Sequence, residues 1–173
     1  MKSDDNLYLV GPMGVGKTTI GKLLAKKLKK QFIDLDDEIE ARAGASIPWI
    51  FDVEGESGFR RRESELLLEI SRRSGMVVST GGGVVTREEN RRILKSDGIV
   101  VYLNASPEQL HARTLKDKKR PLLQVADRLK VIAELKEARD PFYREVADLV
   151  FDVGNRNSRQ ATEILCKKLE HLP

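Results

Sequence analysis

A glycine-rich stretch near the amino terminus, GPMGVGKT at residues 11–18, has the spacing G-x-x-x-x-G-K-T with every position filled. It directly follows the apolar run 7–10 and directly precedes a segment of helical periodicity, which is the context that such a loop requires. Glycines let the backbone turn its N–H groups inward around phosphate oxygens, and the start of the following helix adds partial positive charge. The stretch therefore predicts a site for a nucleoside triphosphate.

The side chains of this loop predict how the triphosphate is held. We expect Lys17 to reach the β- and γ-phosphates and the Thr18 hydroxyl to contact Mg²⁺. The residues expected around the phosphates are Gly14, Val15, Gly16, Lys17, Thr18 and Thr19. A GTPase is disfavoured, because no D-x-x-G directly follows a strand candidate and N-K-x-D is missing from the sequence. A motor or transporter ATPase would normally need a longer chain, so a small-molecule kinase is the class that remains.

Two aspartates, Asp34 and Asp36, stand two apart in FIDLDDEIE at 32–40, where a second strand is expected to end. Ligands of open α/β folds bind at the carboxyl edge of the sheet. Phosphoryl transfer needs carboxylates there, to hold the metal, usually through water, and to accept the proton of the attacking hydroxyl. The alternative is that these acids cap the following helix, a role that fits Asp37 and Glu38 better.

Arginines suggest the charge of the acceptor. Three of them, at 60–62, are expected in the first turn of a helix over 60–75 that Gly75 closes, and the helix dipole disfavours cations in that turn. Another, Arg139, comes just before Pro141, which is expected to break a helix. Arginine grips carboxylate or phosphate with two hydrogen bonds, so the pattern favours an anionic acceptor with a hydroxyl. A solvated charged face is the alternative for one or two of the three.

The elements that must position these residues alternate between short apolar runs and longer stretches of helical period, which predicts an α/β domain with a mainly parallel sheet. Strand candidates are 7–10, 31–35, 76–79, 99–103 and 148–153. Helix candidates are 17–30, 60–75, 106–115 and 158–172. The stretch 36–75 is about twice as long as a simple crossover needs and predicts a helical insertion. The charged, aperiodic stretch at about 115–125 is interpreted as a mobile lid.

Composition is that of one domain of 173 residues, with a formal net charge of +4 from 31 basic and 27 acidic residues. This balance suits anionic small molecules and gives no argument for nucleic acid. A single cysteine excludes an intramolecular disulfide and fits a reducing compartment. The sequence has no run of roughly 20 apolar residues and no signal-peptide core, so we expect a cytoplasmic protein that does not enter a membrane.

In its motifs and their order, the chain resembles the shikimate kinases, which transfer the γ-phosphoryl of ATP to the 3-hydroxyl of shikimate. The resemblance is carried by GPMGVGKTTIGKLLA, FIDLDDEIE, EGESGFRRRE, STGGGVV, KKRPLL and RDPFYREVAD. It implies a three-layer P-loop kinase fold, with a five-stranded parallel sheet flanked by helices, in a single domain over 1–173. It further implies a substrate-binding insertion at about 36–75, a lid at about 115–125, and a monomer whose partners are ATP and shikimate, with no nucleic acid and no membrane.

The resemblance also implies a role for each site residue. Lys17, Asp36 and Arg120 are the implied catalytic residues: Asp36 is the candidate base, and Arg120 in the lid covers the transferring phosphoryl. Shikimate would contact Asp36, Arg60, Gly81, Gly82, Gly83 and Arg139. The nucleotide would contact the phosphate loop, Arg120 and, around the adenine, Arg113 and Arg156. One Mg²⁺ would be held by Thr18 and, through water, by Asp34.

The three consecutive glycines at 81–83 follow the third strand candidate and carry no side-chain bulk. On the resemblance they form the floor of the acceptor site, where a Cβ would occupy the space of the substrate. A tight turn from strand to helix is the structural alternative, and it needs one such glycine rather than three. Two rival functions are a kinase of another hydroxy acid, such as gluconate, and a nucleotide-dependent binding module without catalysis.

Overall fold

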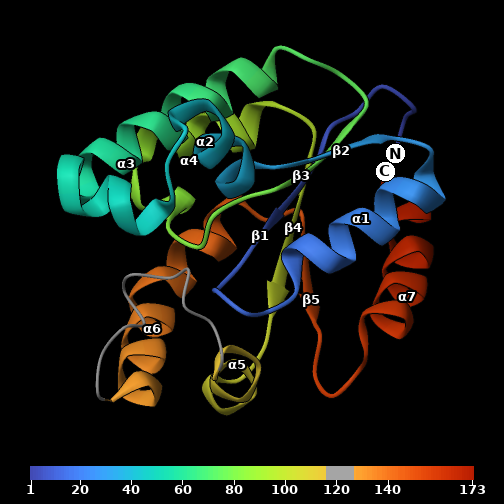
Figure 1. Ribbon diagram of the computed structural model, residues 1–173. Helices are drawn as coiled ribbons and strands as arrows, with labels where there is room; N and C mark the ends of the chain where they lie inside the picture. The colour runs from blue at the N-terminus through green and yellow to red at the C-terminus, as the bar shows by residue number, and fades with distance from the viewer. Residues whose placement is uncertain (116–126) are drawn as a thin grey trace.

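The computed structural model of the protein describes residues 1–115 and 127–173. At its centre is a five-stranded parallel sheet of order β2-β3-β1-β4-β5, with helices on both faces (Figure 1). The strands are β1 (Leu7–Val10), β2 (Gln31–Asp34), β3 (Met76–Ser79), β4 (Ile99–Asn104) and β5 (Leu149–Asp152). The helices are α1 (Lys17–Leu28), α2 (Leu35–Ala43), α3 (Ile47–Ser71), α4 (Glu88–Ser96), α5 (Pro107–Thr114), α6 (Arg128–Val146) and α7 (Ser158–Glu170), with a 3-10 turn η1 (Val84–Thr86). The predicted fold class is confirmed, and every strand ends within one residue of its predicted bounds.

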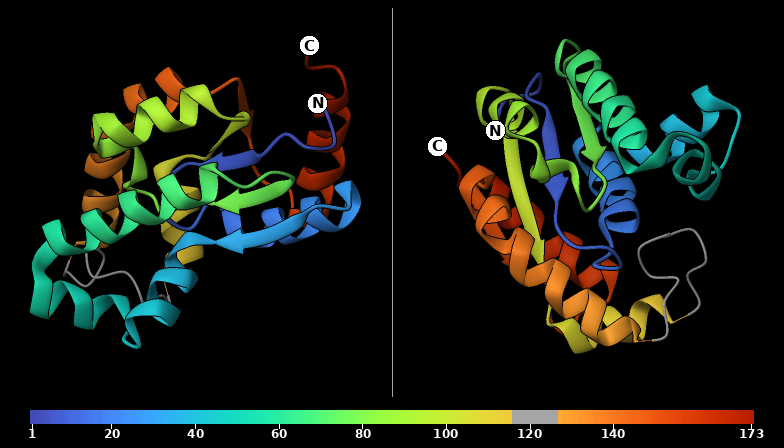
Figure 2. Two further views of the ribbon diagram at one scale, coloured as in Figure 1. Left: turned by 90° about the horizontal axis from the view of Figure 1, so that it is seen from above. Right: turned by 90° about the vertical axis from the view of Figure 1, so that its left-hand side faces the viewer.

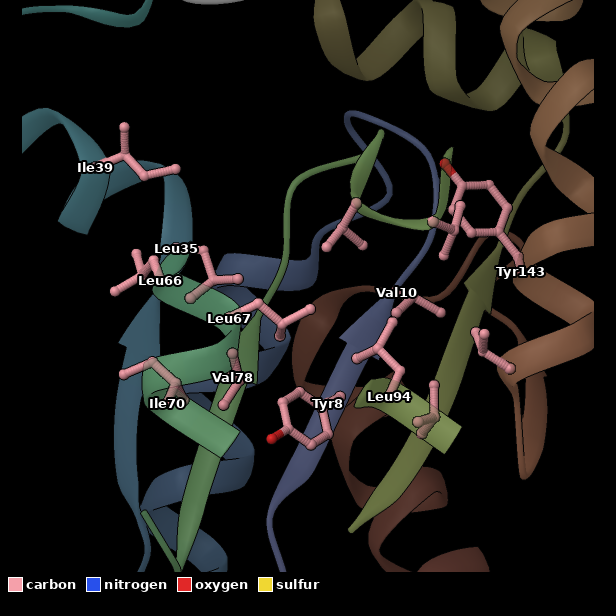
Figure 3. Close-up of a cluster of buried hydrophobic side chains, with 14 of the residues drawn as sticks. Tyr8, Val10, Leu35, Ile39, Leu66, Leu67, Ile70, Val78, Leu94 and Tyr143 are labelled. Atoms are coloured by element: carbon pink, nitrogen blue, oxygen red, sulfur yellow. The ribbon is translucent and has the colours of Figure 1, made fainter. Parts of the chain in front are cut away.

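Helices cover both faces of the sheet, because its strands are apolar on both sides. In β1, Leu7 and Leu9 face α1 and α7, whereas Tyr8 and Val10 belong to the cluster on the other face. That second cluster includes side chains from α3, α4 and α6, and Figure 3 shows many of them packed along β1 and β3. The two cores fix the sheet between two helical layers.

Short sequence signals set several helix ends as predicted. Ser106 caps α5, its hydroxyl accepting the Gln109 N–H, and Pro107 occupies the first turn. α7 starts at Ser158 behind the cap residue Asn157. α1 follows Gly16, whose φ of 102° lies in the left-handed region that favours glycine. Local rules therefore account for the start of these three helices.

The insertion between β2 and β3 differs from its prediction in detail. It consists of α2 and α3, and Gly55, with φ 71° and ψ 175°, breaks the helical path of α3. Figure 2 shows α2 and the first half of α3 at one side of the molecule. Because the second half of α3 begins after Gly55, the arginines at 60–62 lie beyond its first turn, and the predicted dipole conflict is wrong.

The structure contradicts the predicted roles of Gly75 and Pro141, and most of the predicted lid lies outside the described residues. Gly75 does not cap α3, which ends at Ser71 with Arg72 as its cap; Gly75 instead turns the chain before β3, and its N–H donates to the Asp4 carbonyl. Pro141 does not end a helix, because α6 runs through it to Val146. The predicted lid, apart from its first residue, lies outside the described residues. No helix in the described ranges has the length and apolarity that crossing a membrane would take.

A buried polar hub joins the amino ends of the strands. The Asn6 side chain is 2% exposed; its Nδ2 donates to the Arg73 carbonyl at 2.8 Å and to Asp97 at 3.0 Å. Its Oδ1 accepts the Met76 N–H at 3.0 Å. One amide therefore ties the end of α3, the start of β3 and the turn before β4 to β1.

Asn6→Ala should lower the free energy of unfolding by on the order of 2–4 kcal/mol, because it leaves several buried polar groups unpaired. Chemical denaturation measures this value. The exposed Asn155, which accepts a hydrogen bond from Gln109, gives the control Asn155→Ala, with an expected loss of under about 0.5 kcal/mol. Equal losses in the two variants would refute the role of the hub.

Candidate active site

The loops that follow β1, β2 and β3 meet at the carboxyl edge of the parallel sheet, where the predicted residues gather. The glycine-rich loop between β1 and α1 has positive φ at Gly11 (146°), Gly14 (81°) and Gly16 (102°). Space also requires glycine here, since a Cβ on Gly11 would lie 2.3 Å from the Leu103 carbonyl oxygen, and one on Gly14 2.4 Å from the Thr114 Cγ2. Conformation and close packing both explain the glycines of this loop.

The predicted phosphate ligands differ in exposure. Lys17 is 7% exposed, and its Nζ donates to the carbonyls of Gly11 at 2.8 Å and Pro12 at 2.9 Å. The Val15 side chain is fully buried in the core, so only its backbone can serve a ligand, whereas Thr19 is exposed. A buried ammonium held in the curve of the loop is suited to a polyanion.

The two predicted metal-associated side chains are in contact. The Thr18 hydroxyl donates to Asp34 Oδ2 at 2.5 Å, and Asp34 Oδ1 accepts the Asp37 N–H at 3.0 Å. Asp34 is thus the cap of α2, a role that the sequence favoured for Asp37 or Glu38, and that preference is wrong. Since Thr18 donates its hydroxyl proton to Asp34, lone pairs of its oxygen stay available for a cation.

The three consecutive glycines lie against charged side chains from three helices. A Cβ on Gly81 would lie 2.6 Å from Glu63 Oε2 and 2.9 Å from Asp36 Oδ1. One on Gly82 would lie 3.5 Å from Arg139 Nη1, and one on Gly83 only 2.3 Å from an Nη of Arg60. Side chains of α2, α3 and α6 therefore converge on a backbone that has no side chains of its own.

This geometry gives a physical reason for the glycines that differs from the predicted one. Gly81, Gly82 and Gly83 all lie outside the left-handed region; Gly83, for example, has φ −96°. A tight turn therefore does not require them. A Cβ on Gly81 or Gly83 would first meet charged side chains of the protein itself, whereas one on Gly82 would first meet Met13, at 3.2 Å from its Cγ.

Arg60 and Glu63 form a buried ion pair within the second half of α3. Arg60 is 8% exposed and Glu63 is fully buried; Nη1 donates to Oε1 at 3.0 Å, and Glu56 contacts the other Nη at 3.3 Å. Burial raises the pKa of Glu63 to about 7, the Arg60 charge opposes the shift, and the Asp36 carboxylate adds to it. Burial lowers the pKa of Arg60, but Glu63 and Glu56 outweigh it, and the net shift is upward.

Arg139 is the second buried guanidinium of the site. It comes from α6, is 6% exposed, and shares a small cavity with Pro12, Met13 and Tyr143. Within residues 1–115 and 127–173, no carboxylate forms an ion pair with it. A buried cation that lacks a carboxylate partner is costly, so this environment favours an anionic ligand.

Two arginines predicted near the adenine lie together beside the phosphate loop. Arg113 Nη1 donates to the Val15 carbonyl at 3.4 Å, and its Nη2 to the Arg156 carbonyl at 3.5 Å. Arg156 in turn donates to the Asp152 carbonyl at 3.0 Å. The predicted catalytic residue Arg120 lies outside the described residues.

Sequence reasoning assigned no role to two residues that the structure brings into the site. Glu63 stands three residues after Arg60, a spacing at which opposite charges meet on a helix, so this signal was present. Tyr143 stands four residues after Arg139, on the same face of α6, and its hydroxyl donates to the Gly82 carbonyl. Nothing in the sequence links Tyr143 to a glycine 61 residues away.

The shifted Glu63 makes stability depend on pH. Its pKa is raised from 4.5 to about 7 on folding, so the folded state binds a proton more tightly than the unfolded state. The stability that this proton contributes is lost as pH rises from about 5 to 7. Relative to Glu63→Gln, the free energy of unfolding of the native chain should fall by about 2 kcal/mol across that window. Glu65→Gln, at an exposed position two residues on, should keep the native profile. Parallel native and Glu63→Gln profiles would contradict the shift.

Comparisons with known proteins agree with the residues assembled here. The family model described as shikimate kinase matches residues 13–170. A shikimate kinase of Pseudomonas syringae pv. syringae is 54% identical over 168 residues, which cover 97% of this chain and 98% of that protein. This similarity spans the glycine-rich loop, the insertion and α6.

Solved structures give the same result. A shikimate kinase from Acinetobacter baumannii in complex with shikimate has a TM-score of 0.93 at 48% identity, covering 97% of this chain and 94% of that one. A shikimate kinase from Aquifex aeolicus has a TM-score of 0.82 at 36% identity, covering 95% and 96%. From its fold, its site and these relatives, the chain belongs to the shikimate kinase family.

Proposed function

We propose that the chain transfers the γ-phosphoryl of ATP to the 3-hydroxyl of shikimate, giving ADP and shikimate 3-phosphate for the synthesis of aromatic amino acids through chorismate. The observation that carries the proposal is the buried Arg139 guanidinium, which lacks a carboxylate partner among the described residues and lies beside Gly82. Together with Arg60 it suits the carboxylate of a small acid. The related enzyme from Acinetobacter baumannii is described in complex with shikimate.

The proposed reaction uses side chains at one edge of the sheet. The acceptor oxygen bonds to the γ-phosphorus while the bond from this phosphorus to the β–γ bridging oxygen breaks, and ADP leaves. Asp36, close to Gly81 at the start of α2, takes the hydroxyl proton as general base. Arg60 and Arg139 hold the acceptor carboxylate, and Gly81, Gly82 and Gly83 present backbone to the ring hydroxyls. Lys17 contacts the β- and γ-phosphates.

The donor set near the phosphates fits one Mg²⁺ that arrives with ATP. Thr18 and Asp34 offer one hydroxyl and one carboxylate, and the described residues contain no group of three or more His, Cys, Asp or Glu that could hold a metal. Such a sparse set suits Mg²⁺, which keeps waters and phosphate oxygens as ligands. Thr18 would bind the ion directly and Asp34 through water. The ion would offset phosphate charge as the bond breaks.

Further residues are proposed to bind the nucleotide. Gly14, Val15, Gly16 and Thr19 complete the phosphate site with their N–H groups and hydroxyl. Arg113 and Arg156 border the adenine, supported by their contact beside the loop. On the family resemblance alone, Arg120 covers the transferring phosphoryl and excludes water. We further propose a single domain over 1–173, active as a cytoplasmic monomer.

An assay of ADP release with MgATP tests the function. Shikimate should support turnover, whereas gluconate, quinate and the absence of an acceptor should give only background hydrolysis. Turnover with another acid would keep the kinase activity but reject the acceptor assignments of Arg60, Arg139 and the glycines. ATP binding with no reactive acceptor would favour a nucleotide-dependent binding module.

Asp36→Asn should reduce kcat by roughly 10²–10⁴-fold, because the amide cannot accept the hydroxyl proton. The Kd for MgATP should stay within about twofold, since the phosphates are held by the loop and not by this carboxylate. Asp37→Asn removes the same charge one residue further along α2 and should keep kcat. A fully active Asp36→Asn variant would remove Asp36 from the mechanism.

Gly83→Ala should raise the KM for shikimate by at least about tenfold and leave the KM for ATP unchanged, because its Cβ would displace the Arg60 guanidinium. Steady-state kinetics with each substrate varied in turn measures both constants. Gly44→Ala is the control: open space surrounds that position, but its φ is 64°, so it should lower stability and spare both KM values. An unchanged KM for shikimate in Gly83→Ala would reject the account of the glycines.

A further inference from the structure

Tyr143 joins α6 to the glycine-rich turn after β3. Its side chain is fully buried, and its hydroxyl donates to the carbonyl of Gly82. Figure 3 shows the ring projecting from α6, with its oxygen toward that turn, at the end of the core opposite Tyr8. The contact spans 61 residues of sequence and reaches the middle glycine of the acceptor site.

The other two glycine carbonyls are already used inside the turn. The Gly81 carbonyl accepts the Val84 N–H at 3.2 Å. The Gly83 carbonyl accepts the N–H of Thr86 at 3.1 Å and its hydroxyl at 2.7 Å. The Gly82 carbonyl points instead to Tyr143. Because a glycine offers no side chain by which it could be held, this hydrogen bond fixes the central peptide of the turn.

Fixing that carbonyl also fixes an N–H group. The peptide between Gly82 and Gly83 is planar and trans, so its N–H points away from its C=O. In the described part of the chain, no acceptor receives a hydrogen bond from the N–H of Gly82 or Gly83. These two donors therefore have no acceptor among the described residues, and Tyr143 sets the direction of the Gly83 N–H.

The tyrosine itself is held firmly. Its ring stacks on Tyr102, with ring centroids 4.9 Å apart, and the Tyr102 hydroxyl donates to Asp140 of α6 at 2.6 Å. Burial raises the pKa of Tyr143 to about 12, although Arg139 opposes the shift, so the hydroxyl remains a donor at neutral pH. Arg139, one turn earlier on α6, lies over the same Gly82.

We propose that Tyr143 is a positioning residue for acceptor binding: it holds the Gly82–Gly83 peptide so that the Gly83 N–H faces a ring hydroxyl while Arg139 faces the carboxylate. One face of α6 thereby supplies both Arg139, which binds the carboxylate, and Tyr143, which orients the backbone donor. This inference rests on the proposed function, because it assigns the acceptor of that same site.

Tyr143→Phe, compared with Tyr102→Phe, tests the inference. Both changes delete one buried hydroxyl from the same stacked pair, but only the first frees the Gly82 carbonyl. In Tyr143→Phe, the KM for shikimate should rise about tenfold and the KM for ATP should stay within about twofold. In Tyr102→Phe, both KM values should stay within about twofold of the native ones despite a similar loss of thermal stability.

NMR spectra distinguish a specific change at the glycine turn from a general loss of stability. The amide ¹H–¹⁵N signals of Gly82 and Gly83 should move in Tyr143→Phe and stay in place in Tyr102→Phe. Equal rises in the KM for shikimate in both variants, or an unchanged KM in Tyr143→Phe, would overturn the inference while the native enzyme still phosphorylates shikimate. If the native enzyme does not phosphorylate shikimate, the proposed function fails and this inference fails with it.

Discussion

Three consecutive residues without a Cβ are the constraint on which the acceptor side of this molecule depends. Four charged side chains from three helices approach the backbone of Gly81–83. Arg60, Glu63 and Asp36 come closer than a Cβ would allow, and Arg139 would be in ordinary contact with a Cβ on Gly82. Glycine usually appears in such a place because the backbone needs a positive φ, yet these three do not have one. Here glycine leaves space for charged side chains. The turn itself is held by a hydrogen bond from Tyr143 of α6 to the Gly82 carbonyl.

The two buried arginines beside these glycines differ in whether a carboxylate of the protein pairs with them. Glu63 pairs with Arg60 at 3.0 Å, so Arg60 has a carboxylate partner within the protein. Arg139 lacks such a carboxylate in the described ranges, and its charge remains available next to the phosphate loop. We propose that this uncompensated guanidinium binds the single carboxylate of the acceptor.

The sequence predicted what depends on neighbours in the chain. The phosphate loop, the five strands, and the starts of α5 and α7 follow from glycine spacing, apolar runs and capping residues, and all agree with the structure. Three features were missed: the break at Gly55, the passage of α6 through Pro141, and the link from Tyr143 to Gly82, which depends on packing between distant segments. The reason for the three glycines could not be predicted either, because it depends on side chains that other helices place against them. The resemblance named the acceptor residues without giving this cause.

Binding of shikimate and its methyl ester, measured by calorimetry on the same enzyme, tests whether the buried guanidinium groups select the acceptor by its carboxylate. The ester keeps the ring and all three hydroxyls but removes the charge that the buried guanidinium groups are proposed to bind. We expect the ester to bind at least about a hundredfold more weakly, while the Kd for MgATP is the same in both experiments. Equal affinities for the acid and the ester would contradict it, since Arg60 and Arg139 would then not select the acceptor by its carboxylate.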